Sequence, residues 1–455
     1  MELDQLTDDL YQFDPRGNLQ TDIRLLRQRG PAPRVLLPGG ITARVVVDPT
    51  LLKILARDPR VSKDARQHWP ALRDNELPDG WPLLPWFVGE HAFSAEDTDT
   101  VKTHSRLRAP LDQALGLRQV RALEPRIHEI TRAALDDVAR AGTDPATGQP
   151  RVVDLREVLT LAVPIRVISE LLGIPEHLRS PFQACADTLF DTTISKQQML
   201  DNQIKLGQTL NSLIEYRTAH PGDDLTSILL SEQHHDLTYL ERVATIRLIL
   251  VAAIETVGNL QGSAIVNLLA HFDARTAFQT GQIKVDDVIN ETLRLNGPAG
   301  AVPGRFPTET FTITLATETG PADVVFEYGE PILPLWAAAG RDPDTNPNPD
   351  TFDVTRATRR DLAFGHGAHY CAGARLAIAQ TRILLTLLFD RFPQMALAAN
   401  PEEIGHTPGF IGDGPNTVPV LLSPRNPDKT VDNGQGAAAL PTACGTRNST
   451  GASRR

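Results

Sequence analysis

The sequence contains few cysteines, with three among 455 residues, at Cys185, Cys371 and Cys444. An odd number of widely spaced cysteines does not suit a disulfide framework, so we expect reduced thiols and a cytoplasmic protein. Methionine and tryptophan are also rare, with 3 and 4 copies. The core is therefore expected to consist mainly of leucine, valine, isoleucine and alanine.

The sequence also lacks long apolar runs and an excess of positive charge. No uninterrupted apolar run approaches the roughly 18 residues of a membrane-spanning helix. The start, MELDQLTDDLYQFDP, is acidic and polar, so we expect neither a signal peptide nor a membrane anchor. The formal net charge of −11 disfavours general binding to nucleic acid or to anionic membranes. Hydrophobic residues at 41% and charged residues at 22% are typical of a soluble globular protein.

Periodicity predicts a mainly α-helical chain with small β-sheets. Residues 34–48 hold two β-rich runs joined by Pro-Gly-Gly, which predicts a hairpin. Residues 118–275 are mainly helical in pattern, and within them 239–275 is apolar on all sides at its centre. This predicts a long helix that crosses the interior. An irregular loop is expected at 341–353, and a closing edge strand at 418–422.

No linker divides the chain, although its length alone would suggest two or three domains. After about residue 425 the sequence loses any apolar period. We therefore expect a single domain over residues 1–425 and a disordered C-terminal tail over residues 426–455.

Cys371 lies in FGHGAHYCAGARLA, residues 364–377, and three interpretations of it compete. The first is a buried structural cysteine in a turn. The second is a zinc site with His366 and His369, for which a fourth ligand and the ordinary ligand spacing are missing. The third is a thiolate that binds haem iron.

The surroundings of Cys371 favour the haem interpretation. A helix is expected directly after the cysteine, and the partial positive charge at its N-terminus would lower the pKa of the thiol. Gly365, Gly367 and Gly373 would allow a flat macrocycle to approach the backbone closely. Phe364 can shield the sulfur from water.

This stretch matches Phe-Gly-x-Gly-x-His-x-Cys-x-Gly-x-x-Leu-Ala, the haem-binding signature of cytochromes P450, at every fixed position. The sequence thus resembles that family, and especially its soluble bacterial members, over roughly residues 10–425. Gln380 stands where many members carry Glu. The resemblance implies the P450 fold, a triangular prism of helices with small sheets that encloses haem, with one long central helix.

A second resemblance lies in the long helix, in AAIETVGN. Ala252, Ala253, Glu255 and Thr256 resemble the family's oxygen-activation segment, with Ala253 in place of the usual Gly and Val257 in place of a common Thr or Ser. Thr256 can donate to the carbonyl of Ala252 and open the helix locally, which would make room for dioxygen and water. Glu255 and Thr256 are the expected catalytic residues, as a proton relay.

The resemblance also implies structural and haem-binding residues elsewhere. Glu291 and Arg294 in ETLR match the family's Glu-x-x-Arg pair, which holds the loop before the cysteine. The third member of that group is left open, because Thr351 precedes Phe352 in the loop. The cofactor-binding residues implied by the resemblance are Cys371, His104, Arg108, Arg305, His369, Phe364, Gly365, Gly373 and Ala252.

The implied activity is that of a monomeric haem-thiolate monooxygenase. Cys371 would be the axial metal ligand of haem b, and O2 the co-substrate. No flavin- or NADPH-binding fingerprint is present, so electrons from NAD(P)H would arrive through a ferredoxin and its reductase. Arg359, Arg360, Arg375 and Arg106 are candidates to attract an acidic ferredoxin.

Position along the chain also predicts the substrate pocket. Residues 81–96 are expected to form a mobile lid with Trp81, Trp86, Phe87 and Phe93. The residues expected to face the pocket are Leu248, Val251, Ala252, Glu255, Ala299 to Val302, Trp86 and Phe87. Small side chains there suggest room for a steroid, polyketide, terpenoid or peptide-derived ring system. Oxidative coupling of C–C bonds or rings without oxygen insertion is an alternative, and a non-enzymatic haem-thiolate sensor is another.

Overall fold

The helices occupy most of the chain between residues 19 and 391, as predicted. The computed structural model describes residues 10–12, 17–81, 83–89, 94–97, 102–186, 195–317, 320–407 and 409–422. The tail predicted for 426–455 lies outside these residues, as do Cys444 and Phe93. The compact unit that contains all described residues spans Met1–Pro424.

The α-helices are α2 (Leu19–Gln28), α3 (Pro49–Leu55), α4 (Ala65–His68), α5 (Pro70–Arg73), α6 (Leu84–Val88), α8 (Thr103–Ala114), α9 (Leu117–Ala141), α10 (Ala162–Leu172), α11 (Glu176–Ala186), α12 (Lys196–Ala219), α13 (Leu225–Leu230), α14 (Tyr239–Ala270), α15 (Phe272–Gln279), α16 (Val285–Leu295), α17 (Trp336–Gly340) and α18 (Ala374–Arg391). A π-helical segment, η1, covers Arg156–Leu161, and short 3₁₀ turns cover Glu232–His234, Gly367–His369 and Pro401–Glu403.

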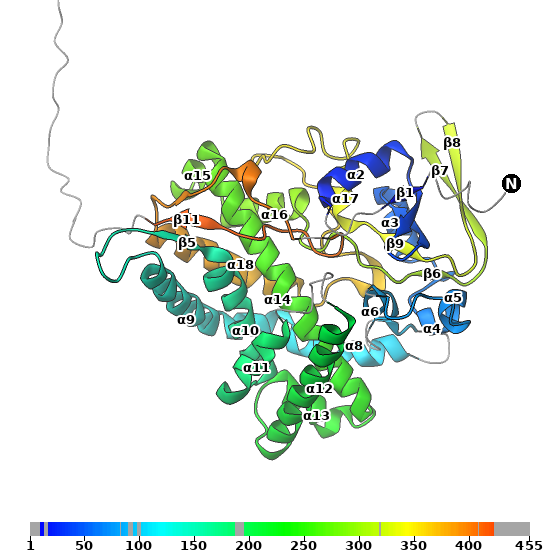
Figure 1. Cartoon of the computed structure of the whole chain (residues 1–455), viewed down its shortest axis with the longest axis horizontal. Coiled ribbons are helices and arrows are strands. Elements are labelled where there is room, and N and C mark those ends of the chain that lie inside the picture. Colours follow the sequence, from blue (N-terminus) through cyan, green and yellow to red (C-terminus); the bar gives the residue numbers. More distant parts are fainter. Residues whose placement is uncertain are drawn as a thin grey trace, which may run out of the picture. The chain divides into compact units, whose positions relative to one another are not determined.

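The strands form small sheets. Their bounds are β1 (Tyr11–Gln12), β2 (Arg34–Leu37), β3 (Ile41–Val46), β4 (Val61–Ser62), β5 (Val152–Asp154), β6 (Phe306–Pro307), β7 (Phe311–Thr317), β8 (Gly320–Phe326), β9 (Ile332–Pro334), β10 (Ala396–Leu397) and β11 (Pro419–Leu421). The largest sheet has the order β1-β2-β3-β9 and lies with α2 and α3 at one side of α14, on the right of Figure 1.

Two expectations about strands have different outcomes. The hairpin predicted at 34–48 is β2 and β3, which pair antiparallel with Leu37 opposite Ile41. The strand expected at 418–422 is β11, but it lies between β10 and β5 in a three-stranded sheet. It is therefore central, because β10 at residue 396 and β5 at residue 152 pair with its two edges.

The long helix α14 begins at a capping box. Thr238 accepts from the backbone N–H of Glu241 at 3.3 Å, and the carboxylate of Glu241 accepts from the backbone N–H of Thr238 at 2.8 Å. The helix runs for 32 residues and ends at Ala270, because the chain turns at His271 into α15. In Figure 1 it passes through the middle of the helices, where it packs against η1, α10, α16 and α18.

Close packing against α14 depends on Gly258. A Cβ at this position would lie 2.9 Å from the carbonyl oxygen of Thr160 and 2.7 Å from the side chain of Leu161. The absence of a side chain therefore lets the π-helical segment η1 approach α14. This contact brings Arg156, the first residue of η1, next to the middle of the long helix.

Among the described residues, two helical stretches are long and apolar enough to cross a membrane by length and composition alone, which the absence of uninterrupted apolar runs did not predict. They are Tyr239–Ala270 and Gly367–Arg391, with mean hydropathies of 1.6 and 1.3. The fractions of these windows buried inside the protein are 56% and 61%. Core helices of soluble proteins have the same properties, because a helix that is apolar on all sides is buried.

Of the four aromatic residues expected in a lid, Trp81 and Phe87 belong instead to the core, whereas Trp86 lines the cavity described below. Trp81 and Phe87 are 2% and 1% exposed, and their ring centroids lie 5.2 Å apart. Both contact Trp69, which in turn stacks on Phe306 with ring centroids 5.4 Å apart. This aromatic cluster fixes Trp81 and Phe87 in the core, since the burial of each large ring contributes about 2 kcal/mol or more.

Candidate active site

Cys371 lies in a tight loop that leads into α18 and opens on a large cavity. Its backbone N–H donates to the carbonyl oxygen of Phe364 at 2.9 Å, and the N–H of Gly365 donates to Leu362 at 2.8 Å. Gly365 has φ +72°, a backbone conformation that favours glycine. These bonds hold the sulfur at the wall of the cavity, which has a volume of about 650 Å³.

The pKa of the Cys371 thiol is raised in the structure, whereas the sequence predicted that it would be lowered. The side chain of Cys371 is exposed to the cavity, but the protein around it displaces bulk water, and this burial raises the pKa of the thiol. The N–H groups of Gly373 and Ala374 and the charge of Arg108 lower that pKa. The helix N-terminus thus lowers the pKa of the thiol, as predicted, but burial has the larger effect. Formation of a thiolate here therefore depends on its binding to a metal.

The opposite side of the cavity comes from α14 and from the loop after α16. Most residues predicted to bind cofactor or substrate line this one cavity. They are Cys371, Phe364, Gly365, Gly373, His104, Arg108, Arg305, His369, Leu248, Val251, Ala252, Thr256, Ala299, Val302 and Trp86. Neither Phe87, which packs in the aromatic cluster, nor Glu255 lines the cavity.

Four basic residues, His104, Arg108, Arg305 and His369, line this cavity together. His104 and Arg305 are 8% and 5% exposed, and the imidazole rings of His104 and His369 have centroids 4.3 Å apart. Arg108 donates to the carbonyl oxygen of Tyr370 at 2.7 Å, which joins α8 to the cysteine loop. The fold thus brings together residues from three parts of the chain: α8, the loop after α16 and the cysteine loop.

Lys63 is a fifth member that sequence reasoning missed. It follows β4, is 3% exposed and lines the same cavity. Burial lowers the pKa of Lys63 well below its usual value, and the charge of Arg305 lowers it further. No motif marks this lysine; the available signal was a charged residue directly after a short apolar strand.

Burial of these basic residues disfavours their protonated forms, and their pKa values are lowered as a result. Burial lowers the pKa of Arg305 to about 10. The pKa of His369 is lowered by burial and then by the charge of Lys63, and the pKa of His104 by burial and then by Arg108. Glu96 is the carboxylate that offsets the positive charge at Lys63 and Arg305. Such a group favours a bound anion.

These residues fit a haem group. The thiol of Cys371 can bind iron, and the cations can bind the two haem carboxylates. A Cβ at Gly365 would meet only the carbonyl oxygen of His369, at 3.9 Å, so glycine leaves cavity volume beside the loop that a flat ring could occupy. Gly367 has another role, because a Cβ there would meet the carbonyl oxygen of Ala56 at 2.5 Å, and Gly367 does not line the cavity.

Thr256 makes the predicted backbone contact. Its hydroxyl donates to the carbonyl oxygen of Ala252 at 2.6 Å, and both residues line the cavity. The helix does not open there, since α14 stays α-helical throughout Tyr239–Ala270. A threonine hydroxyl can share a carbonyl with the helical N–H, so the contact needs no break.

Glu255 points away from the cavity and forms an ion pair with Arg156 of η1. The same guanidinium donates to the side-chain oxygen of Asn259 at 2.8 Å. The side chains of Arg156 and Glu255 are 10% and 13% exposed. No sequence pattern predicts this pair, because its members lie 99 residues apart.

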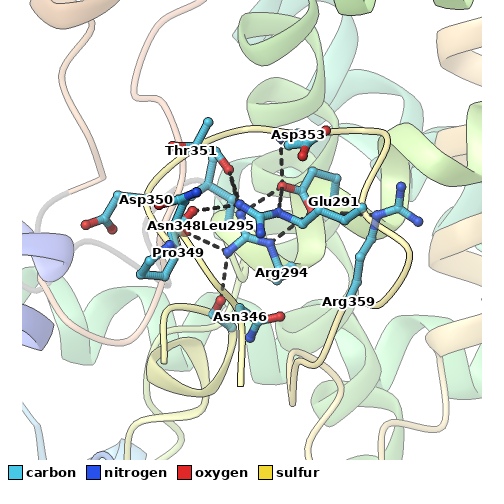
Figure 2. A network of polar contacts seen from close by, with 12 residues as sticks. Glu291, Arg294, Leu295, Asn346, Asn348, Pro349, Asp350, Thr351, Asp353 and Arg359 are labelled. Carbon is cyan, nitrogen blue, oxygen red and sulfur yellow. Dashed lines mark hydrogen bonds and ion pairs between the residues drawn. The ribbon is translucent and has the colours of Figure 1, made fainter. Parts of the chain in front are cut away.

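Glu291 and Arg294 form a fully buried ion pair (Figure 2). Arg294 donates to both carboxylate oxygens of Glu291, at 2.8 and 2.9 Å. Its other N–H groups donate to the carbonyl oxygens of Gly340, Pro349 and Thr351 at 2.8, 2.6 and 2.9 Å. Two of these carbonyls belong to the loop predicted at 341–353.

The third member of this network, which the sequence left open, is Arg356. It donates to Glu291 at 3.0 Å and to the carbonyl oxygens of Asn348 and Thr351 at 2.6 and 3.0 Å. The carboxylate of Glu291 also accepts from the backbone N–H of Asp353 at 2.8 Å. One buried carboxylate thus holds the irregular loop, which leads on to the cysteine loop.

The arginines expected to attract a ferredoxin fall into two groups. Arg359 pairs with Asp287 and Glu291 at 3.4 and 3.6 Å, and Arg106 pairs with Glu241 at 2.5 Å. Both side chains are held in ion pairs within the chain, with exposures of 13% for Arg359 and 31% for Arg106, and are poor docking residues. Arg360 and Arg375 are exposed.

Known proteins are similar to this chain over most of its length. A family model described as "Cytochrome P450" matches residues 284–411. The "2-hydroxy-5-methyl-1-naphthoate 7-hydroxylase" of Streptomyces carzinostaticus is 34% identical over 419 residues, 91% of this chain and 98% of that protein. "Cytochrome P450 monooxygenase PikC" of Streptomyces venezuelae is 32% identical, over 87% of this chain and 89% of that protein. The solved structure of CYP154A1 from Streptomyces coelicolor A3(2) has a TM-score of 0.81 and 36% identity, and covers 91% of this chain and 100% of that one.

Proposed function

The chain belongs to the cytochrome P450 family, and we propose that it hydroxylates or epoxidises a fairly large apolar molecule, such as a steroid, polyketide, terpenoid or peptide-derived secondary metabolite. Its enzyme class is that of its relatives, an oxidoreductase of the P450 monooxygenase type. The observation that carries the substrate proposal is the cavity that Cys371 shares with Thr256 and a mainly apolar wall of α14.

The cofactor is a haem with a cysteine thiolate, as in the family. We assign the iron ligand to Cys371 and the haem carboxylates to Lys63, His104, Arg108, Arg305 and His369. When bound, the haem supplies the chemistry of dioxygen activation, and the thiolate favours cleavage of the O–O bond. The protein's own task is to position the substrate, deliver protons and exclude bulk water.

The proton relay is assigned to Thr256, with Glu255 behind it. The Thr256 hydroxyl lines the cavity, so it can pass a proton to an oxygen atom held there. Glu255 is on the side of the helix that faces away from the cavity, where it forms an ion pair with Arg156. A proton from Glu255 therefore reaches the cavity only when this ion pair loosens or when water connects the carboxylate with Thr256.

Electrons are proposed to come from NAD(P)H through a ferredoxin and its reductase. Arg360 and Arg375, exposed near the cysteine loop, are the remaining candidates to attract an acidic ferredoxin. We further propose a soluble, monomeric, cytoplasmic protein with one haem domain over residues 1–425.

The test is turnover with a surrogate ferredoxin and reductase, NADPH and a library of apolar ring compounds. We expect a Soret shift towards the high-spin form for substrates and a product heavier by one oxygen atom. Coupled products that lose hydrogen without gaining oxygen would favour the alternative reaction. A protein that binds haem but consumes no NADPH with any compound would contradict the proposal.

A further inference from the structure

Ile411 lines the cavity on a segment, residues 409–416, that neither the haem site nor the proton relay uses. The loop after α16 runs antiparallel to this segment and lines the same cavity. The backbone N–H of Gly300 donates to the carbonyl oxygen of Ile411 at 2.9 Å, and that of Asp413 donates to Pro298 at 3.1 Å. A shift of the segment would therefore move Ile411 together with the neighbouring part of the cavity wall.

The same segment packs directly on α14. A Cβ at Gly414 would lie 2.5 Å from the side chain of Asn259, and one at Gly412 would lie 3.3 Å from the Nδ2 of that side chain. Asn259 is fully buried and accepts from Arg156 at 2.8 Å. The two glycines thus allow close packing, and the segment has little room to move towards the helix.

The opposite edge of the segment is held by residues 404–407. The backbone N–H of Thr407 donates to the carbonyl oxygen of Gly414 at 2.8 Å. Across this pairing, Nδ1 of His406 forms a hydrogen bond of 2.9 Å with the carboxylate of Asp413. The imidazole is 31% exposed and the carboxylate 4%. The proton of His406 can therefore exchange with solvent, whereas the carboxylate that it holds lies inside the protein.

Two charges from the described residues act on His406, those of Asp413 and Arg341. The hydrogen bond to Asp413 raises the pKa of His406 above its usual value, against burial and the charge of Arg341. The guanidinium of Arg341 is itself held by the carbonyl oxygen of Leu295 at 2.8 Å and by Asp350. The ion pair is therefore complete below about pH 6.5 and weakens as the pH rises through the folded pKa of His406.

We propose that the His406–Asp413 ion pair positions Ile411 in the substrate cavity, so that protonation of His406 strengthens the binding of ligands that reach Ile411. Both members are positioning residues, because neither lines the cavity. A buried carboxylate that loses its hydrogen-bonded positive partner is unfavourable, so Asp413 and the segment around it loosen when His406 is neutral. The inference rests on the proposed function, since the ligands bind in the haem-loaded cavity.

The test uses haem-loaded protein and three uncharged ligands that bind haem iron through a pyridine nitrogen: pyridine, 4-phenylpyridine and 4-(biphenyl-4-yl)pyridine. Soret titration gives each Kd from about pH 6.5 to about pH 9, where a histidine with a raised pKa titrates. The size gain is the Kd of pyridine divided by that of a larger ligand. In the wild type, the size gain of at least one larger ligand should fall by about fivefold towards pH 9. In His406→Gln and in Asp413→Asn it should not change with pH.

Proton uptake is a second and independent measurement. Linkage is reciprocal, so a ligand that favours protonated His406 must bring proton uptake when it binds. Calorimetry near pH 7.5 (roughly the middle of the range in which this histidine titrates) in two buffers of different ionisation enthalpy measures this uptake. We expect the wild type to take up a fraction of a proton with the responsive ligand and less with pyridine. His406→Gln should show no such difference between the two ligands.

Two further variants complete the design. Ile411→Ala should lower the size gain at every pH and remove most of its pH dependence. His235→Gln is the matched control, because His235 is exposed, its ring contacts the carbonyl oxygen of Glu232 at 3.0 Å, and it does not line the cavity. The pH dependence should persist in that variant.

Haem content and the carbon-monoxide spectrum are recorded for each variant and report on the proposed function separately. With those spectra intact, three results would overturn the inference. They are a wild-type size gain that is constant with pH, a pH dependence that survives in His406→Gln, and size gains that do not respond to Ile411→Ala.

Discussion

Arg156 of η1 holds Glu255 of α14 in an ion pair on the side of the helix that faces away from the cavity. Asn259, one turn further along α14, accepts a second hydrogen bond from the same guanidinium. The residue with the acidic side chain expected in the proton relay is thus fixed to a neighbouring segment. Its link to the cavity passes through Thr256, the next residue in the chain.

Loss of either member of this pair should destabilise the protein. Arg156→Ala is expected to lower the free energy of unfolding by about 3 kcal/mol, because the carboxylate of Glu255 loses its counterion while largely buried. Glu255→Ala should also destabilise. The double variant should lose less than the sum of the two, with a coupling of about 1–3 kcal/mol in urea unfolding. Additive losses would show that the two side chains do not interact.

Thr256→Ala should uncouple electron use from product formation. The hydroxyl that lines the cavity is lost, so proton transfer to oxygen slows, and we expect the rate of product formation to fall by about 10²-fold while hydrogen peroxide appears. NADPH consumption, peroxide and product are measured side by side. Thr256→Ser keeps the hydroxyl and is the control. Unchanged coupling in Thr256→Ala would remove this residue from the relay.

The buried network around Glu291 should respond in a graded manner. Glu291→Ala leaves Arg294 buried without a counterion, and we expect a loss of stability above about 4 kcal/mol or failure to accumulate folded protein. Arg356→Ala removes only one of the three guanidinium groups that pair with Glu291 and should cost about 2 kcal/mol. Chemical unfolding measures both. Equal effects of the two substitutions would mean that Arg294 does not depend on Glu291 in the way that their bidentate contact implies.

The features that the sequence predicted well are encoded locally. The cysteine loop and the back-bond from Thr256 to Ala252 need only residues a few positions apart. The buried character of α14 follows from its apolar centre alone. Local encoding is why the mainly helical fold with small sheets, and the long central helix, are confirmed.

The features that the sequence missed all depend on contacts between distant segments. Lys63, which follows β4, is buried beside the other basic residues of the cavity. Arg356 donates to Glu291, which lies 65 residues earlier in the chain. Phe87 was expected in the pocket, but it packs against Trp69 and Trp81 in the core. Periodicity shows that an aromatic residue is buried and cannot show which surface it packs against.

His406 gives a pH-dependent contribution to stability at a position remote in sequence from the cysteine loop. A hydrogen bond of 2.9 Å to Asp413 raises the pKa of His406 above its usual value, against burial and the charge of Arg341. A raised pKa in the folded state means that the folded protein binds the proton more tightly. The stabilisation is therefore complete below about pH 6.5, the unfolded value, and is lost as the pH rises through the folded pKa.

The comparison with His406→Gln tests this. The wild type should exceed the variant in free energy of unfolding by a constant margin at acidic pH, and the margin should shrink towards alkaline pH. Asp413→Asn is the partner control, since it removes the charge that raises the pKa. A margin that stays constant from pH 5 to pH 9 (roughly the range in which histidine titrates) would contradict the assignment.

Lys63→Met should weaken haem retention. The lysine is buried at 3% exposure among Arg305, His104 and His369, an arrangement that becomes favourable when a haem carboxylate takes up the positive charge. Loss of one charge-assisted hydrogen bond should speed haem transfer to apomyoglobin by about tenfold or more. Lys53→Met, at an exposed site on α3 outside this cavity, should leave the rate unchanged. If both variants release haem at the wild-type rate, Lys63 stabilises the loop after β4 and does not bind the haem. A buried charge that contacts a haem carboxylate cannot be removed without changing the affinity of the protein for haem.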